Sequence, residues 1–271
     1  MHGPHPAARG SAATEALLGT WRAEETGQPD GWDFSALSER VSEPDLPWDL
    51  DGLTRRALAD ADAVLDMGTG GGERLLTFRD LLPTDTTATE GWPPNVPVAR
   101  AALEPAGIDV VAFGQPDDDP EPAPMPFVDG RFDLVLNRHE SYHPAEIARV
   151  LRPGGSLLTQ QVGGGEFGEV RAALNHPPAA PQVEYAAFRA GLQDAGLDVV
   201  DGAEAVGHYA FTDVAALVAY LQLVPWDAPA DFTVSRYAAA LLSLHDRGPV
   251  SGQPLRVTHQ RFWLRAHKPA G

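Results

Sequence analysis

A glycine-rich turn with an acidic residue in front of it is the strongest chemical signal in the sequence. It runs Asp66-Met67-Gly68-Thr69-Gly70-Gly71-Gly72-Glu73 and continues the apolar segment 63–67. Glycines let a backbone bend tightly and approach a ligand closely, because they have no Cβ. A helix that begins at Glu73 would present backbone N–H groups suited to a carboxylate or a phosphate. The turn therefore predicts a site for a small ligand.

Two classes of ligand use a turn of this kind. Dinucleotide sites follow the pattern G-x-G-x-x-G, in which the last glycine allows close contact between helix and strand. Counting from Gly68, Gly70 fits that pattern, but Glu73 stands in the third place and would lie near the pyrophosphate. The acid at Asp66, two residues before the first glycine, indicates a different ligand. The sequence thus disfavours a nicotinamide-dependent oxidoreductase.

A second group of polar residues follows the apolar segment 132–136. His139 could act as a general base, since an imidazole titrates near neutral pH, and Glu140 could orient it or hold a cationic substrate. The strand end at 160–162 is polar as well and could touch the same substrate. His143 lies four residues after His139, but Pro144 argues against one shared helix face. No third ligand is implied, so we expect no metal site.

These residues need a scaffold of alternating strands and helices. Apolar strands are predicted at 63–67, 86–89, 109–113, 132–136, 156–162, 197–200 and 256–266. Helices are predicted at 73–82, 144–151, 185–195, 212–223 and 235–244. This alternation indicates an α/β protein with a parallel sheet and helices on both of its faces. Ligands of such sheets lie beyond the carboxyl ends of the strands, where both groups of polar residues fall.

Four landmarks occur in a familiar order along residues 61–162. The glycine turn reads acid-x-Gly-x-Gly-x-Gly from Asp66, an acid at Glu90 ends the second strand, and Met125-Pro126-Phe127 precedes Phe132-Asp133-Leu134-Val135. The turn 151–155 (Leu-Arg-Pro-Gly-Gly) then leads into an apolar strand. In these features the sequence resembles the class I S-adenosylmethionine (SAM) dependent methyltransferases. The resemblance implies a Rossmann-like, seven-stranded, mostly parallel sheet whose last strand is antiparallel.

The resemblance also implies a role for individual residues. The turn would pass beneath the methionine part of SAM, with Asp66 near its ammonium group, and Glu90 would accept hydrogen bonds from the ribose hydroxyls. Gly91 or Trp92 would lie beside the adenine, and one or more of Asn137, His139 and Glu140 would border the transferred methyl group. The loop 114–119 offers several acids for the adenine amino group without a clear choice. The predicted cofactor-binding residues are Asp66, Gly68, Thr69, Gly70, Glu90, Gly91, Trp92 and Asn137, and the predicted catalytic residues are His139 and Glu140.

The rest of the chain is predicted to cover this domain. We expect residues 1–60 to form an N-terminal tail, disordered up to Thr14, and a helical extension that acts as a lid with Trp32-Asp33-Phe34. Residues 61–271 would form the SAM-binding methyltransferase domain, with a helical insertion at about 207–250. Among the aromatic residues of the extension, Trp21 is expected to serve packing.

Composition narrows the classes of partner. The chain has 38 Asp and Glu against 20 Lys and Arg, a formal charge of −18, and Lys268 is its only lysine. Nucleic-acid binding is therefore not expected, because it needs a basic surface. Without a bilayer-length apolar run, a secretion signal or any cysteine, we expect a cytoplasmic enzyme that avoids membranes.

We expect methyl transfer from SAM to an O, N or C atom of a small molecule, with S-adenosylhomocysteine as product. The alternatives are a methyltransferase acting on RNA or protein, and a SAM-binding protein that transfers no methyl group. The oligomeric state stays open.

Overall fold

The computed structural model describes residues 6–26, 34–114, 123–178 and 182–271. The chain divides into two compact units. The sheet unit comprises Leu46–Gly163, Gln182–Ala205 and Arg261–Gly271, and the helical unit comprises Met1–Asp45, Gly164–Pro181 and Val206–Gln260. The predicted division into residues 1–60 and 61–271 stays a prediction.

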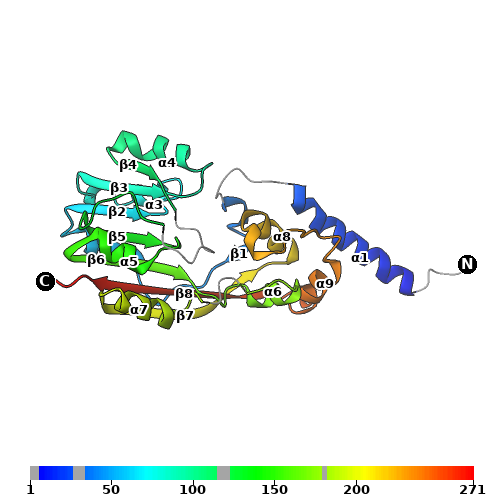
Figure 1. Cartoon of the computed structure of the whole chain (residues 1–271). Helices are drawn as coiled ribbons and strands as arrows, with labels where there is room; N and C mark the ends of the chain where they lie inside the picture. Colours follow the sequence, from blue (N-terminus) through cyan, green and yellow to red (C-terminus); the bar gives the residue numbers. More distant parts are fainter. Residues whose placement is uncertain (1–5, 27–33, 115–122, 179–181) are drawn as a thin grey trace, which may run out of the picture. The chain divides into compact units, whose positions relative to one another are not determined.

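The sheet unit is built on five parallel strands (Figure 1). β2 pairs in parallel with β3 and with β5, β3 with β4, and β5 with β6. β8 is antiparallel to β6. The predicted α/β, Rossmann-like fold with an antiparallel last strand is therefore confirmed. The strands are β2 (Ala63–Met67), β3 (Asp85–Glu90), β4 (Asp109–Ala112), β5 (Phe132–Arg138), β6 (Leu151–Val162), β7 (Asp198–Phe211) and β8 (Leu255–His267).

All seven predicted strands are present, and the complete sheet has an eighth. Its order is β1-β7-β8-β6-β5-β2-β3-β4. β1 (Val41–Ser42) pairs antiparallel with Phe211 and Ala210 at the far end of β7. A strand of two residues is too short to show an alternating pattern in the sequence. The strand predicted at 197–200 is also much longer than expected and continues to Phe211.

Helices cover both faces of the parallel strands because neighbouring strand residues point to opposite sides. In β2, Ala63 and Leu65 belong to one core cluster, with Ile147 of α5, whereas Val64 belongs to another, with Leu58 of α2. The helices of the sheet unit are α2 (Leu50–Leu58), α3 (Glu73–Leu76), α4 (Val96–Leu103), α5 (Pro144–Val150) and α7 (Tyr185–Asp194), with short 3₁₀ turns at Arg79–Leu81 and Glu104–Ala106.

The helix predicted at 73–82 is wrong in its length, since α3 ends at Leu76. Thr77 donates from both its backbone N–H (3.0 Å) and its hydroxyl (2.7 Å) to the carbonyl of Arg74. A side chain that bonds to nearby backbone in this way competes with helical hydrogen bonding. The chain therefore leaves the helix after one turn.

The helical unit contains a core of its own. Trp21, Phe167, Tyr209 and Leu217 are among its buried residues, and the expected packing role of Trp21 agrees with its 1% exposure. Its elements are α1 (Pro6–Ala23), α6 (Gly168–Ala173), α8 (Val214–Leu223) and α9 (Ala238–Asp246), with 3₁₀ turns at Glu24–Thr26, Ser35–Leu37, Pro225–Asp227 and Pro249–Ser251. None of the helices in the described part of the chain is long and apolar enough to cross a membrane.

The predicted disorder up to Thr14 is wrong from Pro6 onward, where α1 begins. Proline fits the first position of a helix, and the alanines that follow have the highest helix propensity, which outweighs the polar character of the segment. Of the predicted lid residues, Trp32 and Asp33 lie outside the described residues.

Candidate functional site

The glycine turn after β2 alternates between ordinary and left-handed backbone. Gly68, Gly70 and Gly72 have φ values of 63°, 65° and 87°, a region that only glycine adopts at low cost. A Cβ on Gly72 would lie 2.7 Å from Leu103, so the third glycine also lets α4 approach the turn. A Cβ on Gly70 would meet no atom within 4 Å, which means that the turn faces open space there.

Most of the turn's backbone donors are used within the protein. Thr69 donates to the carbonyl of Thr89 (2.9 Å), Gly72 to the carbonyl of Thr69 (3.1 Å) and Gly70 to the Glu90 carboxylate (2.9 Å). The helix predicted to begin at Glu73 is present as α3, but it has only four residues. Ligand binding by its backbone N–H groups stays a prediction.

Glu90 at the end of β3 locks the turn in place. Its side chain is buried, and its two oxygens accept three hydrogen bonds: from Gly70 N–H, from Trp92 N–H (2.7 Å) and from the Asn95 amide (3.3 Å). A carboxylate has about four acceptor positions, so one remains. Asn95, the residue directly before α4 (Val96–Leu103), was not predicted, because a single asparagine gives no signal that its amide binds a buried carboxylate.

Four carboxylates approach the turn. Glu140 reaches Gly68, where a Cβ would lie 2.6 Å from the Glu140 Cβ, and Glu73 folds back against Gly71. Glu90 binds Gly70, and Asp66 is the next-to-last residue of β2, two positions before Gly68. The nearby guanidinium of Arg74 is itself paired with Asp51. This arrangement favours a cationic ligand and opposes a pyrophosphate.

Asp66 is the titratable member of this group near neutral pH. Burial raises the pKa of Asp66 to about 6, although the Thr69 hydroxyl and the charge of Arg74 lower it. The carboxyl is therefore mostly ionised at pH 7 and becomes neutral in mildly acidic solution. A cation bound beside it would favour the ionised form.

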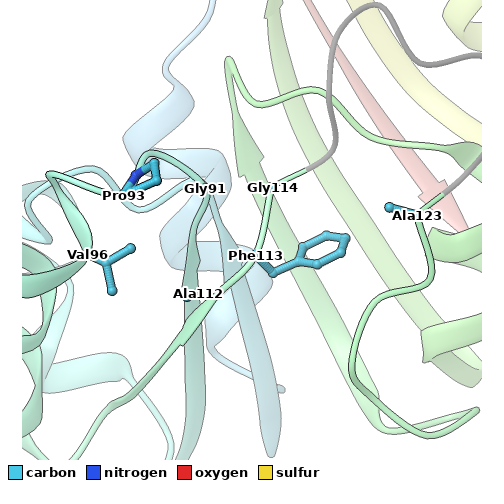
Figure 2. A pocket seen from close by; sticks show the side chains of 7 residues that line it. All are labelled: Gly91, Pro93, Val96, Ala112, Phe113, Gly114 and Ala123. Atoms are coloured by element: carbon cyan, nitrogen blue, oxygen red, sulfur yellow. The ribbon is translucent and has the colours of Figure 1, made fainter.

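A mainly apolar cavity of about 560 Å³ opens beside the ends of β3 and β4. Gly91 and Gly114 lie side by side at its centre, so close that a Cβ on either would lie 2.7 Å from the other's Cα (Figure 2). The cavity is lined by Gly91, Pro93, Val96, Ala112, Phe113, Gly114 and Ala123 (Figure 2). Trp92 is 48% exposed and is not among the lining residues. Of the loop 114–119, only Gly114 is described, so the acids predicted there to contact the adenine lie outside the described residues.

Asn137 at the end of β5 is buried in a network of neutral groups. Its amide donates to the carbonyl of Glu140 (3.1 Å), and its oxygen accepts from Gln161 (2.8 Å) and from Thr159 (3.3 Å). Gln161 also donates to the Glu140 carbonyl (3.2 Å). Asn137 and Gln161 thus position the loop that carries Glu140, and the predicted contact of Asn137 with the cofactor stays a prediction.

His139 stands at the exposed end of the same strand in a strained conformation, with φ 67°. Its backbone N–H donates to the carbonyl of Gln160 (2.8 Å), and its Nε2 lies 3.1 Å from the Gln160 amide nitrogen. The Gln160 oxygen accepts from the indole of Trp48 (2.9 Å). The sequence marked the polar end of β6, but the link to Trp48, 112 residues away, could not be seen without the fold.

The structure thus brings most of the predicted site residues to one edge of the sheet. Asp66, Gly68, Thr69, Gly70, Glu90 and Glu140 meet at the turn, whereas His139 is held at the end of β6. Within the described residues, no group of three or more His, Asp or Glu side chains could hold a metal ion.

Comparisons with known proteins agree with this geometry. Residues 65–159 match a protein-family model described as a methyltransferase domain. The fold is similar to a candidate methyltransferase of Bacillus halodurans (19% identity, TM-score 0.56), covering 82% of this chain and 99% of that one. It is also similar to the YcgJ protein of Bacillus subtilis (18%, 0.55, with coverage of 82% and 99%) and to the [4+2]-cyclase SpnF (17%, 0.52, with coverage of 94% of each chain). No curated protein matches the chain.

Proposed function

We propose that the protein binds SAM at the ends of β2 and β3, because residues 65–159 match a methyltransferase domain and share the landmarks of the class I SAM-dependent enzymes. It transfers the methyl group to an O, N or C atom of a small molecule and releases S-adenosylhomocysteine. The observation that carries this proposal is the set of four carboxylates around the glycine turn.

The charge of these residues fits SAM better than a dinucleotide. SAM has an ammonium, a sulfonium and a carboxylate, and so carries one net positive charge. Carboxylates within several ångströms attract such a cation and repel a pyrophosphate. The turn also reserves few backbone donors for phosphate, since Gly70 and Thr69 donate to β3.

Individual roles follow from the open positions of the site. SAM supplies a methyl group that is already activated by the cationic sulfur, so the protein's task is mainly alignment. Asp66 would hold the ammonium group, and the open space over Gly70 would take the methionine chain. The free acceptor position of Glu90 would receive one ribose hydroxyl. A second hydroxyl would replace the Asn95 amide, whose bond of 3.3 Å is the longest of the three.

The cavity beside Gly91 and Gly114 is suited to the adenine ring. Its lining is mainly apolar, and Val96 and Phe113 offer apolar contacts to a flat ring. A stacking role for Trp92 stays a prediction.

The choice of a small molecule as methyl acceptor is based on the net charge of the chain. A chain with a formal charge of −18 attracts nucleic acid poorly, which favours a small molecule over RNA. Incubation with methyl-labelled SAM and three acceptor pools, namely small metabolites, total tRNA and unfolded protein, tests this directly. Label in the small-molecule pool alone supports the proposal. Label in tRNA or protein alone contradicts the acceptor class while leaving the methyltransferase assignment intact.

A second candidate is a protein that binds SAM without methyl transfer. SpnF has a similar fold and is named a cyclase, so the fold alone does not require methylation. This observation supports the second candidate. Saturable SAM binding without label in any pool would support this candidate.

A further inference from the structure

The side chain of Gln160 has its orientation fixed by Trp48. An indole N–H can only donate a hydrogen bond, so the atom 2.9 Å from it must be the amide oxygen of Gln160. Gln160 is only 3% exposed, so its buried amide nitrogen needs a partner within the protein. The amide nitrogen therefore points away from Trp48, toward the end of β5.

His139 receives that amide nitrogen. The distance from the Gln160 nitrogen to His139 Nε2 is 3.1 Å. Since the amide nitrogen is a donor, Nε2 must be the acceptor and cannot carry a hydrogen. A neutral imidazole with a bare Nε2 carries its proton on Nδ1. The backbone bond from His139 N–H to the Gln160 carbonyl (2.8 Å) holds the two residues in register.

We propose that Gln160, oriented by Trp48, is a positioning residue that holds His139 as the neutral Nδ1–H tautomer. The single lone pair of Nε2 is engaged, and Nδ1 has no lone pair to offer. His139 therefore cannot accept a proton from a methyl acceptor while this bond stands. Its part in the reaction rests on the proposed function: His139 acts as a fixed polar group beside the methyl acceptor. A proton released by the acceptor then leaves by a route other than His139.

Protonation of His139 at Nε2 would destabilise this hydrogen-bonded arrangement. It would set an imidazole N–H against the amide N–H of Gln160 and leave a buried donor without a partner. Gln160 cannot turn over to help, because its oxygen would then leave the Trp48 indole, and its nitrogen would face another donor. The chain Trp48–Gln160–His139 thus has one consistent arrangement of hydrogens.

Nitrogen NMR of protein labelled with ¹⁵N-histidine tests the inference directly. The cofactor-free protein is measured at neutral pH, and His139 is assigned by loss of its signals in His139→Gln. We expect a protonated Nδ1 and a bare Nε2. A protonated Nε2 in the wild-type protein would overturn the proposal.

Two variants extend the test. In Gln160→Glu, the carboxylate accepts from both Trp48 and His139, so the Nε2 of His139 becomes protonated. In Trp48→Phe, the amide is free to turn over, and signals of the Nε2–H form appear. Gln193→Glu places the same charge on the exposed face of α7 and should leave the wild-type pattern. Unchanged His139 signals in both variants would contradict the roles of Gln160 and Trp48.

The readout does not depend on catalysis. Should SAM fail to bind, the tautomer can still be measured, and the inference stands or falls by itself. If Gln160→Glu does not fold, as judged by its thermal unfolding, the Trp48→Phe spectrum decides.

Discussion

The two halves of the site are built from different chemistry. Around the ends of β2, β3 and β4 the protein places carboxylates on a glycine turn, with Glu90 binding the turn itself. At the ends of β5 and β6 it uses neutral amides, with Asn137 and Gln161 beneath the loop and Gln160 on His139. Under the proposed function, charge on the first side would favour a cationic cofactor, whereas the uncharged hydrogen bonds on the second side hold the loop and His139 in place.

The largest loss of SAM affinity is expected when a side chain is added to the glycine turn. Gly68→Ala places a methyl group in a left-handed backbone and against Glu140, so SAM binding should weaken by more than about 100-fold, or about 3 kcal/mol. Gly107→Ala is the matched control, because Gly107 has φ 81° but open space around its Cβ. It adds backbone strain without a collision. Equal losses of SAM affinity in both variants would contradict a steric role for Gly68.

Removing the carboxylate that locks the turn should have the next largest effect. Glu90→Ala leaves Gly70 N–H and Trp92 N–H without their acceptor and takes away the ribose contact. We expect SAM affinity to fall about 10- to 100-fold, which corresponds to about 1–3 kcal/mol. Calorimetry measures it, with Glu104→Ala, an exposed acid after α4, as the control. Wild-type affinity in Glu90→Ala would remove Glu90 from the site.

The pKa of Asp66 predicts a dependence on pH. Its folded value of about 6 lies above the ordinary 3.8, so the folded protein holds this proton more tightly than the unfolded chain. The stability that this proton contributes is complete below pH 3.8 and is lost as the pH rises to about 6, by up to about 3 kcal/mol. SAM affinity should change in the opposite direction and rise through pH 6 as the carboxylate forms.

The difference between wild type and Asp66→Asn isolates this residue from the other titrating groups. Urea unfolding at pH 4 to 7 should show the wild type losing stability relative to the variant as the pH rises. SAM titrations should show a step near pH 6 in the wild type only. Parallel pH profiles for the two proteins would mean that Asp66 does not titrate near pH 6 or does not face the cofactor.

The smallest effect is expected from neutralising Glu140. Glu140→Gln keeps the shape of the side chain against Gly68 and removes only its charge. We expect SAM affinity to fall about 3- to 10-fold, or about 1 kcal/mol, because the sulfonium loses a nearby anion. S-adenosylhomocysteine, which lacks the sulfonium, should bind unchanged. An equal loss for both ligands would show that the Glu140 charge does not distinguish them.

The charged half was largely predictable from the sequence, whereas in the neutral half the sequence indicated the positions of Asn137, His139 and the strand end 160–162 but not the hydrogen bonds between them. Alternating glycines at Gly68, Gly70 and Gly72 correspond to alternating left-handed residues, because side chains exclude that conformation. An acid at a strand end such as Glu90 is equally visible. By contrast, Gln160 gains its meaning from Trp48, and Asn95 from Glu90, through contacts that only the folded chain brings together. Local bonding also ended α3 early at Thr77, a competition that periodicity does not reveal.

Calorimetric titration with SAM, S-adenosylhomocysteine and NADH, each alone at pH 7.5, tests the central claim most directly. The carboxylate-lined turn predicts saturable binding of both adenosyl ligands, tighter for the cationic SAM, and no binding of NADH. Binding of NADH without SAM would contradict the account, because a pyrophosphate would then be accepted beside Glu73 and Glu90.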